Sequence, residues 1–556
     1  MNDFSFKRRI ILVIGSIITS FAFSIATLYF PLCNRLDFND SSIYQYIGYS
    51  ICNGKIPYVD VFDHKGIYFY FINALGYLIN PIKGMYPLIW VAMFFNVIVI
   101  YHSARKFFGI EYSVIIVLLL VSSMACTSWN GNIPDFFAMP FVLGAFDKLI
   151  DYFQNKYLLS KDVLFASVCT TLAFWMKPNM VLSTILFCIY ISVQLVISQN
   201  LKFVINYIAV FIIGFIMTSL PAILWLYFNS GLFDMIEDYF LYSLKYAGFH
   251  TTIDLQINAF STFVSYPISV LTLVFILIWL ISLLKKKVTD TEINHIFSCG
   301  VISFVICLIH VSLTGNAYTH YMMLLYPPIL LIIIGFALLT KGVFTGNGKC
   351  FVILLLLSIV VIGMNIKKEY LIGKYFMQEV PEEDLEVRFI IDNSNETDTI
   401  AVISPQYTGF YLASNRQSAT KYIYVQSNHF TNLKENPEEE EEFWNEYTAS
   451  LLKSKPRVIV YDTGYNGNDD FIKGVLNKCL KEYTYAGASL FREFYILPNS
   501  EEEIIPSFQS QFQKRQEKNS FEITIPKEML EAYREGKITI DDFLEYYDTQ
   551  IMNIGD

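Results

Sequence analysis

Long apolar runs separated by short polar loops fill the first two thirds of the chain. Each run is long enough, or nearly so, to cross the roughly 30 Å hydrocarbon core of a bilayer as a helix. About eleven runs fit this pattern, near residues 10–29, 86–103, 112–126, 136–150, 162–176, 179–197, 203–227, 262–284, 295–314, 322–340 and 350–365. The pattern predicts an α-helical polytopic membrane protein.

One further apolar stretch, at 67–82, is short and is interrupted by Asn73, Asn80 and Pro81. If it crossed the bilayer, every later loop would change sides, and the asymmetry of the basic loops would be lost. We therefore predict a helix that lies at the outer membrane interface or enters it only in part.

The basic residues of the short loops favour one side of the membrane. With eleven crossings, the following residues share that side: Lys7, Arg8, Arg9, Arg105, Lys106, Lys156, Lys161, Lys202, Lys285 to Lys287, Lys341 and Lys349. The short loops of the other side hold fewer basic residues. The positive-inside rule then predicts a cytoplasmic N-terminus and an extracytoplasmic C-terminal region.

The composition changes after about residue 366. Helix-like segments at 382–394, 439–455 and 469–480 alternate with strand-like segments at 399–404, 456–462 and 483–497. This alternation predicts a small α/β domain with a mainly parallel sheet. We divide the chain into a transmembrane domain (1–366), an extracytoplasmic α/β domain (367–498) and a polar C-terminal extension (499–556).

The composition agrees with this division. The chain is 54% hydrophobic and 16% charged, whereas soluble domains are usually about 45–50% apolar and roughly 25% charged. The net charge of −10 and the acidic C-terminal part leave no basic face for a nucleic acid. The nine cysteines show no zinc-binding spacing. Cys33 and Cys52 share a loop, where they either pair in an oxidising compartment or remain free thiols.

Side chains capable of chemistry gather in the loop 30–66, which comes after the first apolar run. Asp40, Asp60 and Asp63 lie there with His64 and Lys65. Carboxylates beside a membrane surface are costly to desolvate, which favours a functional explanation for the group as a whole. For each carboxylate alone a structural role competes; Asp40, for example, would be a favourable N-cap of a short helix.

The residues of this loop resemble the first loop of GT-C glycosyltransferases. More narrowly, they resemble the bacterial relatives of protein mannosyltransferases and of the lipid A aminoarabinose transferase. Three elements carry the resemblance in order: Asp40 followed by Tyr44, the N-G-x-x-P-Y-x-D turn with Tyr58 and Asp60, and F-D-H-K-G at 62–66. Together they span the loop directly after the first apolar run.

The resemblance continues at the outer ends of later spans, up to about residue 345. Asp135 begins a span, Lys177 ends one in F-W-M-K-P, and His320 and Tyr321 form a His-Tyr element before a late span. Each also has an ordinary explanation: a helix cap for Asp135, a snorkelling anchor for Lys177, and the aromatic belt for His320 and Tyr321. Their convergence on one predicted face favours a shared function.

The resemblance implies an integral-membrane glycosyltransferase with a polyprenyl-phosphate sugar as donor and a glycan, lipid or protein as acceptor. Inverting transfer needs a carboxylate that takes the acceptor's proton, which is the role implied for Asp40. It also needs positive charge on the departing phosphate. That role is implied for Lys65, with Lys177, His320 and Tyr321 in support.

The remaining residues of the pattern have less specific roles. Asp135 and Asp63 are candidates to position an acceptor hydroxyl or a divalent metal ion, whose ligands would be Asp40 and Asp135. Tyr44, Tyr58, Asp60, Asp63 and His64 are expected to support the loop. A membrane transporter or lipid flippase is the main alternative, but it predicts ionisable residues near the membrane midplane rather than in external loops.

Overall fold

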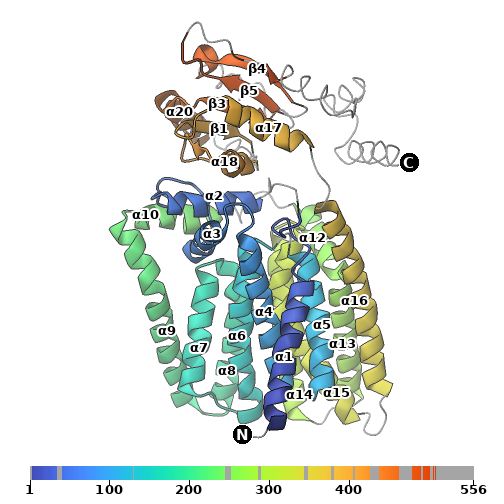
Figure 1. Cartoon of the computed structure of the whole chain (residues 1–556). Helices are drawn as coiled ribbons and strands as arrows, with labels where there is room; N and C mark the ends of the chain where they lie inside the picture. Colours follow the sequence, from blue (N-terminus) through green and yellow to red (C-terminus); the bar gives the residue numbers. More distant parts are fainter. Residues whose placement is uncertain are drawn as a thin grey trace, which may run out of the picture. The chain divides into compact units, whose positions relative to one another are not determined.

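The computed structural model describes residues 3–33, 40–128, 131–244, 252–285, 290–343, 349–376, 381–404, 407–425, 437–462, 479–489, 492–500, 505 and 507–508. The chain forms two compact units, Met1–Glu379 and Val380–Asp556. The first unit is a helical bundle, and the second contains a β-sheet (Figure 1).

Among the residues that the structure describes, seven segments of the bundle are helices long and apolar enough to cross a membrane. They correspond to α4 (Met85–Arg105), α5 (Ile110–Thr127), η1 with α8 (Pro178–Val181 and Leu182–Ile197), α9 (Leu201–Phe228), α13 (Pro267–Leu284), α14 (Thr291–Leu313), and η3 with α15 (Thr319–Leu325 and Tyr326–Val343).

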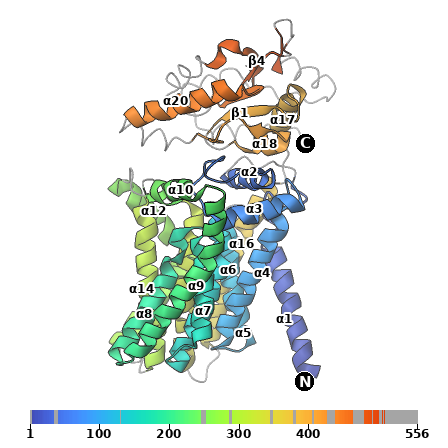
Figure 2. The ribbon, with the colours of Figure 1, turned by 90° about the vertical axis from the view of Figure 1, so that its left-hand side faces the viewer.

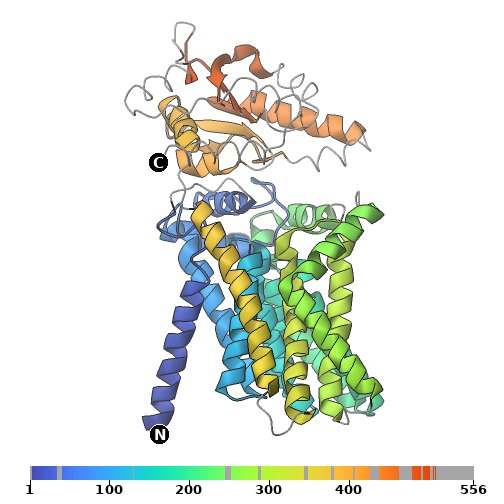
Figure 3. The same ribbon diagram turned by 90° about the vertical axis from the view of Figure 1, so that its right-hand side faces the viewer.

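Four further helices run alongside them in the same bundle (Figures 1 and 3). These are α1 (Asp3–Ala22), α6 (Pro134–Asn155), α7 (Ser160–Phe174) and α16 (Lys349–Phe376). Each of the eleven predicted apolar runs therefore coincides with a helix, and the prediction of a polytopic helical membrane protein is confirmed.

Helix boundaries differ from the predicted ones where polar residues continue a helix. The run 136–150 belongs to a helix that begins two residues earlier, with Pro134 in its first turn, and ends at Asn155. Proline suits the first turn because its missing N–H would have no partner there. The first run was predicted at 10–29, but α1 ends at Ala22 and the chain continues in successive turns.

Short helices cover one end of the bundle, opposite the start of α1 (Figures 1 and 2). They include α2 (Asp40–Cys52), α3 (Ile67–Ile79), α10 (Leu232–Met235), the adjoining π-helix η2 (Ile236–Leu241) and α12 (Ile253–Ser265). Helix α3 comes from the apolar stretch 67–82, and it is shorter than the spanning helices, as predicted. The pairing of Cys33 with Cys52 was left open; Cys52 is a free thiol, so these residues form no disulfide.

A polar contact inside the bundle holds α16 against α5. The Asn365 amide nitrogen donates to the hydroxyls of Ser122 at 3.1 Å and Ser123 at 3.0 Å. The Cys126 thiol donates to the Asn365 carbonyl at 3.2 Å. All four residues are buried. In a membrane such hydrogen bonds between helices satisfy groups that no water can reach.

The second unit has a five-stranded sheet in the order β2-β1-β3-β5-β4. The strands are β1 (Thr399–Ile403), β2 (Gln417–Ser418), β3 (Val458–Asp462), β4 (Thr484–Ala488) and β5 (Arg492–Ile496). Strands β2, β1 and β3 are parallel, while β5 pairs antiparallel with both β3 and β4. The sheet is thus mixed, because the segment 483–497 forms a hairpin rather than a crossover.

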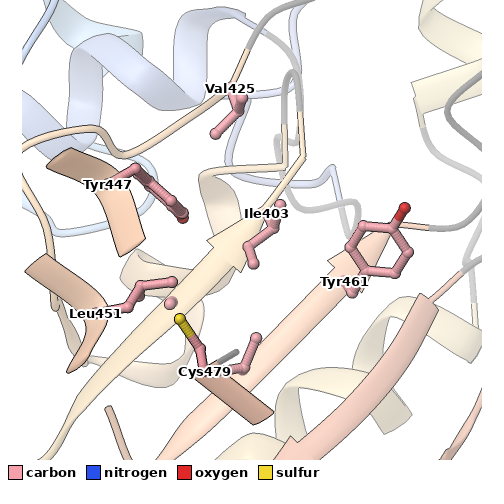
Figure 4. Packing of buried hydrophobic residues seen from close by; sticks show 8 residues of the cluster. Ile403, Val425, Tyr447, Leu451, Tyr461 and Cys479 are labelled. Carbon is pink, nitrogen blue, oxygen red and sulfur yellow. The ribbon is translucent and has the colours of Figure 1, made fainter. Parts of the chain in front are cut away.

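Helices accompany this sheet as the alternating pattern predicts. They include α17 (Pro381–Asp392), α18 (Gly409–Ser414) and α20 (Pro437–Ser454). Side chains of α20, β1 and β3 form a buried core with Cys479, which precedes the short helix η4 (Leu480–Glu482); the core includes Ile403, Tyr447, Leu451 and Tyr461 (Figure 4). Most of the predicted helix at 469–480 and nearly all of the extension 499–556 lie outside the described residues.

Candidate functional site

Asp40, the carboxylate expected to act as a base, is the first residue of α2. It lies in the first turn, where the partial positive charge of a helix N-terminus favours a carboxylate. The charge of Asp40 acts on the amine of Lys65 and on the phenol of Tyr318. Tyr44, one turn along the same helix, has its ring centroid 6.0 Å from the Lys65 Nζ. Three distant parts of the sequence therefore meet at this helix end.

The turn before Lys65 is shaped by its own residues. Gly54 has φ +80° and Tyr58 has φ +71°, a conformation that is unusual for a tyrosine. The Asp60 carboxylate accepts a hydrogen bond from the Ile56 N–H at 2.8 Å. The hydroxyl of the buried Tyr58 donates to the Lys65 carbonyl at 2.6 Å. Tyr58 and Asp60 thus set the course of the loop that carries Lys65.

Asp63 is buried, and a tyrosine connects it to Lys65. The hydroxyl of Tyr70, in α3, donates to the Asp63 carboxylate at 2.6 Å and accepts from the Lys65 N–H at 2.9 Å. His64 Nδ1 lies 3.5 Å from the other Asp63 oxygen. The peptide of Lys65 is therefore held from both sides, by Tyr70 at its nitrogen and by Tyr58 at its carbonyl.

The Lys65 side chain points into a set of charged groups. Its Nζ forms a hydrogen bond with His64 Nε2. Burial lowers the pKa of Lys65 below its ordinary value, and the charge of Lys177 lowers it further, while Asp63, Asp40 and Asp135 oppose this shift. A buried cation beside a second cation is a favourable place for an anion.

Lys177 and Asp135 form an ion pair. Lys177 comes just after the end of α7, and its Nζ lies 2.8 Å from both carboxylate oxygens of Asp135, in the first turn of α6. Asp135 is almost completely buried. The Nζ also lies 4.8 Å from the ring centroid of Tyr321. The two residues that the sequence placed at the ends of different spans are thus in direct contact.

His320 and Tyr321 lie in η3, next to this pair. The His320 ring is stacked on Tyr318 with centroids 5.6 Å apart, and it meets the Tyr321 ring edge to face at 4.8 Å. The charges of Asp135, Lys177 and Lys65 all act on His320. The site residues named from the sequence therefore lie together at the end of the bundle that carries α2.

The described residues do not offer a metal site. No group of three or more His, Cys, Asp or Glu side chains placed to hold a metal ion occurs among them. Both oxygens of Asp135 face the Lys177 Nζ, whereas Ca²⁺ binds about 6–8 oxygen ligands and Mg²⁺ about six. In this arrangement the ammonium group of Lys177 supplies the positive charge next to Asp135.

Two buried residues that support the site were not singled out from the sequence. Asn132 donates from its amide to the Asn73 side chain at 2.9 Å and to the Ser41 carbonyl at 3.2 Å. It thereby joins the start of α2 to α3 and to the loop before Asp135. Tyr70 links Asp63 to the Lys65 peptide. Asn73, the partner of Asn132, can be noticed in the sequence because it is a polar residue in an apolar stretch. Tyr70 cannot, because aromatic residues are common in such stretches.

The arrangement combines two kinds of chemistry. A carboxylate at a helix start can take a proton from an incoming hydroxyl. Two ammonium groups within electrostatic range of each other can hold an anion and stabilise charge that develops on it. An acceptor and an anionic leaving group could therefore react between α2 and the Lys177 loop.

A family model matches most of the bundle. The family described as "Putative competence-induced protein Ccs4 N-terminal domain" matches residues 2–369. No curated protein sequence matches the chain.

The solved structures similar to this chain include ArnT from Cupriavidus metallidurans bound to undecaprenyl phosphate. It is 12% identical, with a TM-score of 0.59, over 89% of this chain and 98% of ArnT. The apo form of the same protein gives a TM-score of 0.56 at the same identity and coverage. The apo oligosaccharyltransferase of Archaeoglobus fulgidus gives 0.48 at 12% identity, over 89% of this chain and 75% of that chain. ArnT has the GT-C fold, and this chain shares it.

Proposed function

The chain belongs to the competence-induced protein Ccs4 N-terminal domain family and has the GT-C fold, and from these premises we propose that it is a membrane glycosyltransferase. Its donor is a sugar carried on a polyprenyl phosphate, and its acceptor is a glycan, a lipid or a protein. The bound undecaprenyl phosphate of ArnT, the similar structure, supports this donor class.

One observation supports the proposal most strongly. Lys177, which is far from Lys65 in the sequence, lies within electrostatic range of it at one end of the bundle, and so does Asp40. The end of a bundle that spans a bilayer lies near the lipid headgroups, so this position of Lys65 and Lys177 supports a role in binding a lipid phosphate.

The proposed reaction is a single inverting displacement. An acceptor hydroxyl attacks the anomeric carbon of the sugar, and its proton passes to the Asp40 carboxylate. The bond between that carbon and the phosphate oxygen breaks, and its electron pair leaves with the polyprenyl phosphate. Lys65 neutralises the charge that develops on this phosphate, and Lys177, His320 and Tyr321 support it.

The other site residues position these groups. Asp135 holds the Lys177 ammonium in place, and Tyr44 faces that of Lys65. Asp63 and His64 form one connected set with Lys65. In the proposed step Lys177 supplies positive charge beside Asp135.

We place this site on the extracytoplasmic side. It lies at the end of the bundle opposite the start of α1 (Figure 1), and the basic residues 7–9 predict that the N-terminus is cytoplasmic. Polyprenyl-linked donors would then be used outside the cytoplasm, in the assembly of cell-envelope glycans.

The test is an assay of the purified full-length protein in lipid nanodiscs. A panel of labelled polyprenyl-phosphate sugars is added with mixed cell-envelope acceptors, and release of free polyprenyl phosphate is measured. We expect release with at least one donor from the wild-type protein and a loss in Asp40→Asn. No release from any donor, together with transfer of a labelled lipid across proteoliposomes, would favour a flippase instead.

A further inference from the structure

The chain segments that carry Lys65 and Lys177 touch through their backbones. The Gly66 N–H donates a hydrogen bond to the Met176 carbonyl at 3.1 Å. Each lysine is the direct neighbour of one of these two residues. The spacing between the two lysine backbones is therefore set by this single contact.

The contact leaves no room for a side chain at Gly66. A Cβ atom there would lie 1.9 Å from the carbonyl oxygen of Trp175, 2.4 Å from its carbonyl carbon and 2.9 Å from the Met176 Cα. All three are backbone atoms, so no side chain can rotate to make space. Gly66 has φ −82° and ψ 147°, which any residue can adopt. Glycine is thus required here by the close approach and not by its backbone angles.

The Trp175 side of the contact is firmly held. Trp175 is buried, and its indole N–H donates to the Ser219 hydroxyl of α9 at 2.8 Å. Its ring is stacked on Tyr239 of η2, with centroids 6.3 Å apart and an angle of 17°. The Lys177 N–H donates to the Ala173 carbonyl at 2.9 Å, which fixes the start of the next segment to the end of α7.

The Lys65 side is held as well. Tyr70 binds the Lys65 N–H, and Tyr58 binds its carbonyl, both from buried positions. The Gly66 carbonyl accepts from the Phe69 N–H at 3.0 Å and so joins the segment to α3. Neither segment can move without breaking several of these contacts.

We propose that Gly66 is a positioning residue that makes Lys65 and Lys177 one two-cation unit for the donor phosphate. This inference rests on the proposed function. Two ammonium groups on long flexible side chains lose much conformational freedom on binding one anion, and a fixed backbone spacing lowers that cost. Asp135 and Asp63 balance part of the charge while the unit is empty.

The substitution that tests the spacing is Gly66→Ala. Its methyl group must push the two segments apart, and a misplacement of about 1 Å in a site of this kind can cost on the order of 10²-fold in rate. The matched control is Gly363→Ala, because Gly363 is exposed on α16 and a Cβ there meets nothing within 4 Å. Both variants replace a glycine with an alanine.

The measurements are made on the full-length protein in nanodiscs. For Gly66→Ala we expect affinity for undecaprenyl phosphate to fall by about tenfold or more and kcat/KM for the active donor to fall with it. We also expect the alkaline limb of kcat/KM to move to higher pH, because Lys65 and Lys177 no longer face each other so closely. If Gly66→Ala only unfolded a fraction of the protein, the amount of active protein would fall, but the alkaline limb of kcat/KM would stay at the same pH.

A second measurement avoids dependence on how well Gly66→Ala folds. The first variant is Lys65→Met. The second is Lys177→Met together with Asp135→Asn, so that no buried carboxylate is left without its partner, and the combined variant carries all of these substitutions. If the lysines act as one unit, the loss of undecaprenyl phosphate affinity in the combined variant differs from the product of the separate losses by about threefold or more. A loss that equals this product overturns the proposal, as does a Gly66→Ala that behaves like Gly363→Ala.

The proposed function and this inference can fail separately. Weaker binding of undecaprenyl phosphate by Gly66→Ala in a protein that transfers no sugar would keep the two-cation unit and reject the transferase. Sugar transfer by the wild type with unchanged binding and kinetics in Gly66→Ala would keep the transferase and reject the unit.

Discussion

Burial and the charge of a neighbouring lysine both lower the pKa of Lys65 and so oppose its protonated form. An incoming phosphate relieves both effects, because it pairs with the ammonium and offsets the repulsion from Lys177. Relief of this unfavourable charge in the empty site therefore favours binding of the phosphate. It also favours cleavage of the bond to the sugar, because that cleavage adds negative charge to the phosphate. Lysine presents its charge as a compact ammonium group, whereas arginine would present a larger planar group.

This environment predicts a pH dependence. The protonated amine is the form that binds phosphate, and the pKa of Lys65 is lowered by burial and by Lys177. As pH rises, Lys65 therefore loses its charge earlier than an ordinary lysine does. We expect kcat/KM, which reports the free enzyme, to decline at a pH below the usual lysine range. The control is Lys65→Met, whose residual activity should lack this decline. If kcat/KM of the wild type declines only in the usual lysine range, the role of Lys65 is contradicted.

Substitutions of Lys65 separate a leaving-group role from simple attraction to headgroups. Any cation near the surface attracts anionic lipid by about 1 kcal/mol, so attraction alone predicts similar activity for Lys65→Arg. The tight surroundings of Lys65 predict a clear loss for Lys65→Arg and a larger one, about 10²–10³-fold, for Lys65→Met. Turnover of a defined polyprenyl-phosphate sugar is measured at low and high salt. Equal turnover in all three proteins rules the phosphate role out.

Asp40→Asn tests the proposed base. Asparagine keeps the size of the side chain and is also favoured at helix starts, so α2 should remain intact. We expect turnover to fall by about 10²–10⁴-fold, the usual effect of losing a positioned base, while the affinity for undecaprenyl phosphate changes little. The control is the thermal unfolding midpoint of the same preparation. If turnover stays near that of the wild type, the proton goes elsewhere, and Asp63 or Asp135 becomes the candidate.

The charged groups of this site could be found from the sequence, but the contacts that hold them could not. Asp40, Lys65, Asp135 and Lys177 stand out because ionisable residues at span ends are costly and match a known pattern. The close approach at Gly66 depends on how the end of α7 meets the loop before α3. Such packing arises from three-dimensional contacts between segments about 110 residues apart, and the local sequence does not record it.

At the scale of helices, apolar length was a reliable guide because a membrane requires about twenty apolar residues per crossing. It failed where charged residues continue a helix. Helix α6 extends to Asn155, past Asp151, and therefore exceeds its apolar run, which was predicted to end at residue 150. In the second unit, the alternation of segments predicted the strands but not the hairpin that makes the sheet mixed.

The charged residues of α6 are paired with the end of α4, at the end of the bundle away from the candidate site. The buried Asp147 carboxylate accepts from His102 Nδ1 at 2.7 Å and from the Ser103 hydroxyl at 3.0 Å. Lys106 Nζ lies 3.2 Å from Asp147 and 2.7 Å from Asp151. This cluster adds polar contacts between the two helices.

We expect Asp147→Ala to destabilise the bundle without changing the chemistry. The substitution leaves buried donors of Ser103 and Lys106 without one partner, at about 1–3 kcal/mol; Lys106 keeps Asp151. Thermal unfolding in detergent should show a lower midpoint, while KM and kcat per folded molecule stay close to the wild type. Asp254→Ala is the control because Asp254 is exposed. An unchanged midpoint would show that the cluster contributes little.

For the molecule as a whole, orientation decides where the chemistry occurs. Helix α1 begins at one end of the bundle, and α16 ends at the other (Figure 1). The candidate site shares the latter end. The second unit comes after α16 in the chain, so we propose that it lies on the same side of the membrane as the site.

Cysteine labelling in intact cells tests this orientation. In a cysteine-free background, Ser500→Cys in the second unit should react with a membrane-impermeant maleimide. Ser198→Cys, in the loop between α8 and α9, should react only after the cells are permeabilised. Both positions are exposed. The opposite labelling pattern contradicts the topology and, with it, the use of an extracytoplasmic donor.

The hydrogen bonds between Asn365 and α5 have a consequence for the history of such chains. They bind α16 to the bundle from within, through Ser122, Ser123 and Cys126, so its anchorage does not depend on the segments C-terminal to it. Segments added, exchanged or lost after α16 by gene fusion would leave the bundle unharmed. Descendants of one ancestor could thus acquire different appendages while inheriting the same bundle.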